Sequence, residues 1–340
     1  MSQPSIRIAS FNLESLDEPP RGRIAVEKRI EILRPQLLRL RADVLCLQEV
    51  NGQNETDGTR SLRVLDKVLS GTAYANYHRV HSQSPSGKGA RDRHNLVTLS
   101  RFPITKFEEV CHTRMEPPLY HPVTEKPLQK NALPINWERP VLMCQLDMNA
   151  GAGAGAGAGT NNPLHVINVH LRAPRAAFIS GQKKDAKSWK SMPGWAEGYF
   201  IAALKQSGQA LEVRFLIDEI FDQNPHALVC VVGDFNADDH EAPVRIIRGD
   251  EDDVGSGEFA ARMLVAAERS LPESQRFSII HRGKAQMFDH ILVSNNLLAW
   301  LRKTEIHNEA LGDEVASPAA IADAPESYHA PIVADFENPL

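Results

Sequence analysis

The sequence predicts an α/β protein in which two mixed β-sheets pack face to face and helices cover their outer faces. Segments with the length and alternation of β-strands outnumber long helical segments, and they follow one another without regular βαβ alternation. The chain has 340 residues, of which 42% are hydrophobic, and this is enough for a large core. A doubly wound parallel sheet fits this order of elements less well.

The N-terminal half is expected to combine strands with two helices. Residues 5–11 (SIRIASF) alternate polar and apolar side chains, as a half-buried strand does. Residues 23–40 carry apolar side chains at helical spacing, which predicts a long helix. A buried strand, a short helix and two further strands are expected at residues 43–48, 62–69, 75–80 and 95–100, respectively.

The C-terminal half is expected to open with a hairpin of residues 138–148 and 164–171. Its tip, residues 150–160 (AGAGAGAGAGT), lacks charged and anchoring side chains and is expected to be a flexible loop. A long helix at residues 195–221 and strands at 228–232, 287–294 and 331–336 complete the set. We expect one domain over residues 1–340, with the hairpin tip 150–160 and a loop insertion at 172–194.

Composition narrows the classes of protein only slightly. The net charge is −5 and the pI about 6.2, so no general attraction to nucleic acid or to an anionic membrane is indicated. The four cysteines show neither CxxC nor zinc-type spacing, and two lie inside apolar runs. Neither a secretory signal nor a transmembrane run is evident. The expectation is a cytoplasmic, reduced protein with no transmembrane segment and no evident obligate protein partner.

Six short motifs, each beside a strand-like run, carry most of the functional information. They are SFN, LQE, NVHL, GDFN, FDH and SYH, which supply Asn12, Glu49, His170, Asp234 with Asn236, Asp289 and His329. The first four motifs follow their strands, whereas FDH and SYH precede or open theirs. If the last two strands run antiparallel to the others, all six motifs meet at one edge of the fold.

These residue types suit metal-dependent phosphoester chemistry. Carboxylates and carboxamides are ligands for Mg²⁺ or Mn²⁺, and such an ion can polarise a phosphoryl oxygen. His170 and His329 titrate near neutrality, and Asp289 could hold one imidazole in the tautomer needed for catalysis. No Ser or Cys nucleophile occurs in an elbow motif. The pattern therefore favours direct attack of water on phosphorus.

The six motifs, in this order, resemble the endonuclease/exonuclease/phosphatase superfamily over about residues 5–336. This family includes deoxyribonucleases, apurinic endonucleases, sphingomyelinases and inositol polyphosphate phosphatases. The resemblance implies a four-layer αββα sandwich and a divalent metal, usually Mg²⁺. It also implies that Asn12 and Glu49 are metal-site residues.

The resemblance implies catalytic roles for the remaining motif residues. Asp234 would orient or deprotonate the attacking water, and Asn236 would contact the phosphate or that water. His170 would act as acid or phosphate ligand, and Asp289 would orient His329, which stabilises the phosphoryl transition state or transfers a proton. One departure stands out: the family's last motif is commonly Ser-Asp-His, whereas Tyr328 here replaces the aspartate. We therefore expect either that the metal rests mainly on Glu49 or that catalysis uses a different second position.

The expected substrate is a phosphodiester, with nucleic acid as the first choice. Residues 172–190 hold six basic side chains against one acid and interleave aromatic residues, a combination that binds phosphates and bases. The expected substrate-binding residues are Arg172, Lys183, Lys184 and, in the strand motif HNLVTLSRFPI, Asn95. A phosphatase or phosphodiesterase acting on a small or lipid head-group phosphoester is the alternative. A catalytically weak binding protein on the same fold is a second alternative.

Overall fold

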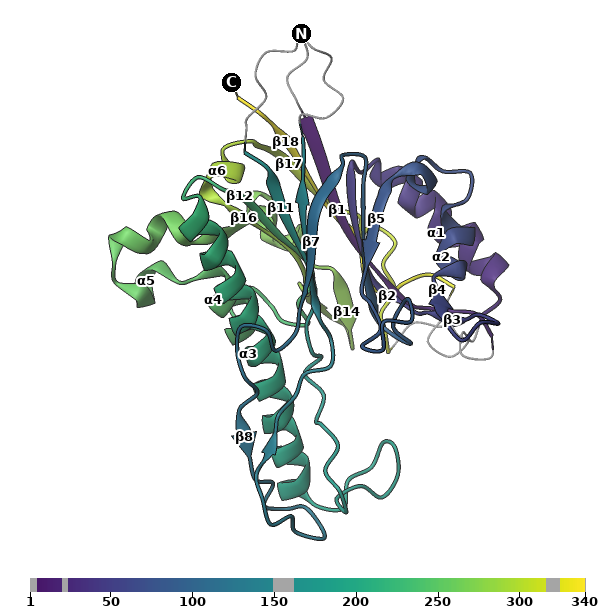
Figure 1. Cartoon of the computed structure of the whole chain (residues 1–340), viewed down its shortest axis with the longest axis vertical. Coiled ribbons are helices and arrows are strands. Elements are labelled where there is room, and N and C mark those ends of the chain that lie inside the picture. Colours follow the sequence, from purple (N-terminus) through teal and green to yellow (C-terminus); the bar gives the residue numbers. More distant parts are fainter. Residues whose placement is uncertain (1–4, 20–23, 149–161, 316–324, 340) are drawn as a thin grey trace.

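A computed structural model describes residues 5–19, 24–148, 162–315 and 325–339. It contains two six-stranded mixed sheets, as the sequence predicts (Figure 1). The first sheet has the order β17 (Leu301–Ile306), β18 (Ile332–Glu337), β1 (Ser5–Leu16), β2 (Val44–Val50), β6 (Asn95–Ser100) and β5 (His78–His81). Within it only β1 and β2 are parallel neighbours.

The second sheet has the same mixed character. Its order is β13 (Leu264–Ala266), β16 (Asp289–Ser294), β12 (Leu228–Asp234), β11 (Leu164–His170), β10 (Val141–Leu146) and β7 (Ile104–Val110). Strands β10 and β11 form the predicted antiparallel hairpin, and β11 and β12 are parallel. The predicted flexible tip at residues 150–160 lies outside the described residues.

Alternating side chains of the strands form three apolar layers. Ile8 of β1 and Cys230 of β12 face the core between the two sheets. Phe11 of β1 faces the helices α1 (Val26–Leu40) and α2 (Arg63–Leu69), and Val229 of β12 faces α3 (Met192–Gln223) and α4 (Ala242–Arg248). The order is therefore helices, sheet, sheet, helices, which confirms the predicted sandwich.

The remaining secondary-structure elements are short. They are the strands β3 (Gln53–Asn54), β4 (Arg60–Ser61), β8 (Leu119–Tyr120), β9 (Leu133–Pro134), β14 (Ile279–His281) and β15 (Lys284–Gln286), the helices α5 (Glu251–Val254) and α6 (Asn295–Leu298), and short 3-10 turns at Ala73–Asn76, Gly257–Arg262, Ala267–Ser270 and Glu273–Gln275. In the described residues no helix is both long and apolar enough to cross a bilayer.

Three strands of the two six-stranded sheets were not predicted, and one prediction was misplaced. β7 (ITKFEEV) and β17 (LRKTEI) are edge strands, where charged side chains reach solvent and hide the apolar alternation. β13 has only three residues. The strand expected at 75–80 begins instead at His78, because residues 73–76 form a 3-10 turn.

The N-terminal half of α3 projects beyond the sheets and carries residues 112–137 and 173–191 with it (Figure 1). We call residues 112–137 and 173–205 the arm. Its core contains Ile135, Ile179 and Ile201. Glu197 of α3 accepts hydrogen bonds from the main-chain N–H groups of Val123 at 2.6 Å and of Thr124 at 2.8 Å. Within the predicted loop insertion 172–194, Ala177 and Ile179 pack with Ile201 of α3, and residues 192–194 form the first turn of this helix.

Candidate active site

The predicted polar residues of the second sheet lie side by side at one end of it. Asp234, the last residue of β12, is in register with His170 at the end of β11. Asp234 is also in register with Asp289, the first residue of the antiparallel strand β16. The glycine before it, Gly233, has φ +143° and passes close to the main chain of β11.

The first sheet brings its residues to the same end. Asn12 of β1 is in register with Gln48, which precedes Glu49 in β2. His329 lies just before β18, and β18 is antiparallel to β1. The amide nitrogen of Asn12 donates to Asp234 Oδ2 at 2.9 Å across the two sheets. The expectation that antiparallel strands unite the motifs at one edge is confirmed.

Asp234 is buried and accepts three hydrogen bonds. Its Oδ1 accepts from the main-chain N–H of Asn236 at 2.8 Å, and its Oδ2 accepts from the amides of Asn12 at 2.9 Å and Asn236 at 3.0 Å. Burial, with the negative charge of Asp289, raises the pKa of Asp234 to about 7. A carboxylate with a pKa near neutrality and a fixed orientation is suited to accept a proton from water.

His329 forms an ion pair with Asp289. Its Nδ1 donates to Asp289 Oδ2 at 2.8 Å, so Nε2 remains available on the opposite side of the ring. Burial opposes protonation, but the charges of Asp289 and Asp234 outweigh it and raise the pKa of His329 to about 10. Ser327 anchors the segment, because its hydroxyl donates to the Asn12 carbonyl at 2.7 Å and accepts from the His329 N–H at 3.1 Å.

His170 differs from His329 because it is neutral. Its burial and the nearby charge of Arg139 hold its pKa well below the ordinary range. Arg139 Nη1 donates to His170 Nε2 at 2.5 Å and to the Leu171 carbonyl at 2.9 Å. His170 Nε2 also lies 3.4 Å from Asp234 Oδ2 and 3.6 Å from Glu49 Oε1. Sequence reasoning missed Arg139, which lies within the strand predicted at residues 138–148 but outside the six motifs.

Glu49 directs its Oε1 toward His170, and its Oε2 lies near both His94 and Ser15 of β1. Its Oε2 accepts from the main-chain N–H of Ser15 at 2.9 Å and from the Ser15 hydroxyl at 3.0 Å. His94 Nδ1 lies 3.7 Å from the same oxygen. Burial raises the pKa of Glu49, but the positive charges around it, led by His94 and Arg139, outweigh burial and lower the pKa. Glu49 is therefore ionised at neutral pH.

Glu14 is a second site carboxylate that sequence reasoning missed. It accepts a hydrogen bond from the Tyr328 N–H at 2.8 Å, and its own N–H donates to the Asn12 carbonyl oxygen Oδ1 at 2.8 Å. Burial, with the charge of Glu49 adding to it, raises the pKa of Glu14. No simple sequence signal places Glu14, because regular strand geometry is interrupted after Asn12: Glu14 and Ser15 have φ of +47° and +51°, and the register with β2 shifts there. Glu14 thus adds a carboxylate beside Tyr328, which stands where the family's Ser-Asp-His motif has its aspartate.

The residues present fit a divalent cation. Two groups have candidate ligand atoms that lie within 4.8 Å of one another: Glu49, His94 and His170, and Asp234, Asp289 and His329. Among the described residues, Asp289 Oδ1 is a buried oxygen with no hydrogen-bond partner. Glu49 and Glu14 repel each other, and a cation between carboxylates relieves such repulsion. Asn12, predicted as a metal-site residue with Glu49, lies in the same cluster.

The prediction that Asn95 binds substrate is contradicted. Its side chain is fully buried, because Oδ1 accepts from the Arg91 N–H at 2.8 Å and Nδ2 donates to the carbonyls of Val50 at 2.8 Å and Arg91 at 2.9 Å. Every polar atom of the side chain is bonded to the main chain. Asn95 therefore fixes the conformation of the loop that precedes β6.

The basic residues predicted to bind substrate lie at different places. Arg172 follows His170 by two residues and lines two cavities next to the site. Lys183 and Lys184 belong to the arm, where Lys183 Nζ lies 4.3 Å from the centre of the Trp189 ring. Across the described chain, no hydrogen bond or ion pair connects these two lysines with the site.

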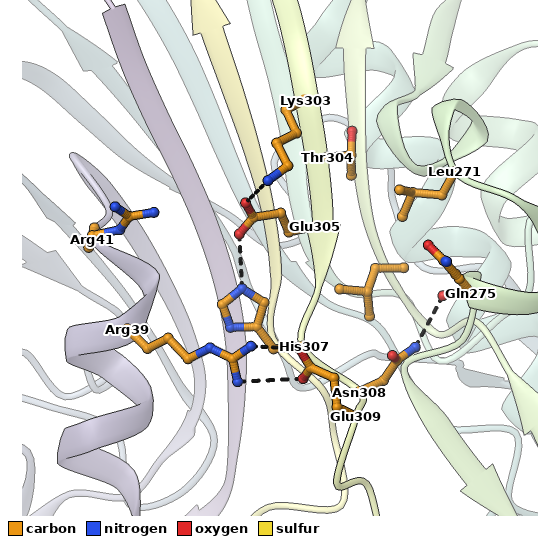
Figure 2. Close-up of a pocket in the computed structure, with 11 residues that line it drawn as sticks. Arg39, Arg41, Leu271, Gln275, Lys303, Thr304, Glu305, His307, Asn308 and Glu309 are labelled. Atoms are coloured by element: carbon orange, nitrogen blue, oxygen red, sulfur yellow. Dashed lines mark hydrogen bonds and ion pairs between the residues drawn. The ribbon is translucent and has the colours of Figure 1, made fainter.

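A separate cavity of about 650 Å³ lies between the end of α1 and β17 (Figure 2). Its charged side chains pair with one another: Arg39 with Glu309 at 2.5 Å, and Lys303 with Glu305 at 2.7 Å. None of the seven residues that the six motifs supply lines it. We assign this cavity no part in the chemistry.

Comparison with known proteins places this geometry in a family. The sequence model described as the Endonuclease/Exonuclease/phosphatase family matches residues 9–317. The chain belongs to the endonuclease/exonuclease/phosphatase family. Members of this family hydrolyse phosphoester bonds and generally depend on a divalent metal. No curated protein sequence matches the chain.

Solved structures of this family share the fold at low sequence identity. TDP2 from C. elegans is 16% identical with a TM-score of 0.53, and the match covers 98% of this chain and 75% of that one. The 3′ phosphatase NExo from Neisseria, bound to a product DNA hairpin, is 16% identical with a TM-score of 0.52, over 98% and 100% of the two chains. An AP endonuclease from Archaeoglobus fulgidus is 14% identical with a TM-score of 0.50, over the same shares.

Proposed function

We propose that the protein is a divalent-metal-dependent phosphodiesterase of the nuclease kind, using Mg²⁺ or Mn²⁺. One observation carries the proposal: a buried carboxylate with a near-neutral pKa, Asp234, lies in a single cluster with an ionised Glu49 and an imidazolium, His329. This set provides a base, a metal ligand and a cationic acid at one edge of the fold. The structural neighbours, one of which is bound to a DNA hairpin, favour nucleic acid as the substrate.

In the proposed reaction Asp234 takes a proton from water as the water oxygen attacks phosphorus. Asn12 and Asn236 hold the carboxylate so that its lone pairs face the site. The imidazolium of His329 stabilises negative charge on the phosphoryl oxygens and donates a proton to the leaving oxygen as the P–O bond breaks. Asp289 keeps this imidazole protonated and oriented.

Two further groups would bind the phosphate and the metal. Arg139 now donates to His170, and its guanidinium is positioned to donate to a phosphate oxygen instead. Glu49, with Asn12 and Glu14 beside it, would hold the cation. A bound divalent ion supplies Lewis-acid polarisation of the phosphoryl oxygen.

A substrate panel tests the proposal. The purified protein would be assayed on plasmid DNA, single-stranded DNA, RNA and bis-p-nitrophenyl phosphate, with Mg²⁺, Mn²⁺ or EDTA. We also propose that the protein is cytoplasmic, which this assay does not address. Metal-dependent cleavage of a polynucleotide is expected. Turnover of the small diester alone would favour a small or lipid head-group phosphoester as the substrate. Absence of activity on every substrate would favour a binding protein.

A further inference from the structure

A basic cavity of about 420 Å³ adjoins the active site, and the proposed reaction uses only Arg139 of the residues that line it. Five arginines line it, against the acids Asp92 and Glu138: Arg60, Arg91, Arg93, Arg139 and Arg172. The chain as a whole carries a net charge of −5. The cavity is therefore positively charged although the protein as a whole is negatively charged, and such a local excess of cations favours binding of an anion.

The arginines of this cavity have unsatisfied donors. Arg60 pairs with Asp92 at 3.2 Å, and Arg91 lies 3.5 Å from Glu109. Nevertheless, among the described residues the Nε atoms of Arg60, Arg91 and Arg172 are buried and have no hydrogen-bond partner. A buried N–H without an acceptor is destabilising, and the oxygens of a phosphate would satisfy it.

The wall of the cavity is held rigidly. Asn95 bonds to the main chain of Arg91 at both its N–H and its carbonyl. The His94 N–H donates to Asn51 Oδ1 at 3.0 Å, which fixes His94 in the left-handed region at φ +55°. Such a loop presents its arginines without having to order on binding, which favours affinity.

The cavity is continuous with the catalytic cluster on one side and with the arm on the other. Arg139 and His94 line it and also contact His170 and Glu49, respectively. A second cavity of about 560 Å³ shares its lining residues Arg172 and Glu138. That cavity runs along the arm and is lined by the apolar side chains of Leu133, Phe178 and Ile179.

We call the basic cavity the arginine pocket, and the second cavity, along the arm, the apolar groove. We propose that the arginine pocket binds the phosphate next to the scissile phosphate of a nucleotide chain. The neighbouring nucleoside would then lie against the apolar groove. This deepens the proposed function and rests on it. Phosphate contacts from arginine fix the register of the chain, and an exposed aromatic ring such as Phe178 offers a surface on which a base can stack. A substrate with a single phosphate would leave the pocket empty.

Binding of two small probes tests the pocket independently of catalysis. We would titrate the protein with thymidine 3′,5′-bisphosphate and with thymidine 5′-monophosphate, in the presence of Mg²⁺, by calorimetry. The wild-type protein should bind the bisphosphate at least about 10-fold more tightly, because only this probe can place one phosphate at each position. In the double variant Arg60→Gln/Arg93→Gln this preference should largely disappear, with monophosphate affinity unchanged.

A matched variant controls for a general loss of positive charge. Arg79 has the same exposure as Arg60, 34% against 33%, and likewise pairs with an aspartate, but does not line the pocket. Arg79→Gln should therefore retain the preference. Equal affinity for the two probes in the wild type, or a preference that survives the double variant, would overturn the proposal, as would a failure of both probes to bind.

Hydrolysis of bis-p-nitrophenyl phosphate separates this inference from the proposed function. This diester carries one phosphate, so the double variant should hydrolyse it at the wild-type rate. Absence of hydrolysis in the wild type would contradict the phosphodiesterase proposal, and the probe affinities would still report on the pocket. Hydrolysis without any bisphosphate preference would contradict the pocket alone.

Discussion

Replacement of Asp289 by Asn should change the pH dependence of hydrolysis in a defined direction. The carboxylate of Asp289 lies 2.8 Å from His329 Nδ1 and is the main influence that raises the pKa of His329 to about 10. An opposite charge at this distance shifts a pKa by about 1–3 pH units. Loss of the carboxylate should therefore lower the alkaline limit of activity by about that amount.

The sign follows from which protonation states are active. Asp234 must be ionised, so kcat/KM should rise as pH increases through about 7. His329 must be protonated, so the rate should fall as pH passes through about 10. In Asp289→Asn both limbs should move to lower pH, because the charge of Asp289 also helps raise the pKa of Asp234; the shift of the alkaline limb is the one that reports on His329. The maximal rate should drop by about 10²–10⁴, because the imidazole also loses its fixed orientation.

The assay is hydrolysis of bis-p-nitrophenyl phosphate between about pH 5.5 and pH 10 at a fixed metal concentration. Asp57→Asn serves as the control, since Asp57 is exposed and bonds only within its own turn. Thermal unfolding followed by circular dichroism would show that Asp289→Asn is folded. An alkaline limb that does not move in this variant would refute the assignment of His329 as the protonated partner of Asp289.

Three further substitutions have predicted outcomes. Gly233→Ala would place a Cβ 2.0 Å from the Val169 carbonyl oxygen, so the free energy of unfolding in urea should fall by at least about 3 kcal/mol. Glu268→Gln removes the buried partner that helps raise the pKa of His290 to about 9. At pH values under 6.5 this variant should have a free energy of unfolding about 3 kcal/mol lower than the wild type. The difference between the two proteins should shrink as pH rises through about 9. Glu49→Gln should weaken Mn²⁺ binding, measured by calorimetry, at least about 10-fold.

Each of these variants has a control at an exposed position of the same residue type. Gly257→Ala meets no atom within 4 Å and should leave stability unchanged. Glu258→Gln and Glu31→Gln alter exposed carboxylates and should affect neither the pH dependence of unfolding nor Mn²⁺ affinity. A Glu268→Gln variant whose stability deficit grew at high pH would show that His290 is not the protonated partner.

The sequence predicted the strands that carry the motifs because these strands are buried. Strands β2 and β12 are central and apolar on both faces, so their ends could be located and the polar residues after them recognised. The edge strands β7 and β17 were missed because their charged side chains break the alternation. The arm could not be foreseen, since it depends on buried glutamates of α3, such as Glu197, binding a distant segment.

For the site, the residues that could be predicted are those inside recognisable motifs, and the residues outside such motifs were missed. Residues inside recognisable motifs, such as Asp234 and His329, lie in the cluster where the pattern of strands places them. Arg139 was missed because nothing in its local sequence distinguishes it from a surface arginine; only the packing of β10 beside β11 brings it to His170. Asn95 was misjudged for the opposite reason, since a polar residue at the start of a strand can bond inward as well as outward.

The most direct test of the account is the rate of Mg²⁺-dependent hydrolysis of bis-p-nitrophenyl phosphate by the wild type and by Asp234→Asn. The account predicts metal-dependent turnover by the wild type that EDTA abolishes and a rate at least about 10²-fold lower in the variant, with both proteins folded. Turnover by Asp234→Asn at the wild-type rate would contradict the central claim that the buried carboxylate at the end of β12 activates the attacking water.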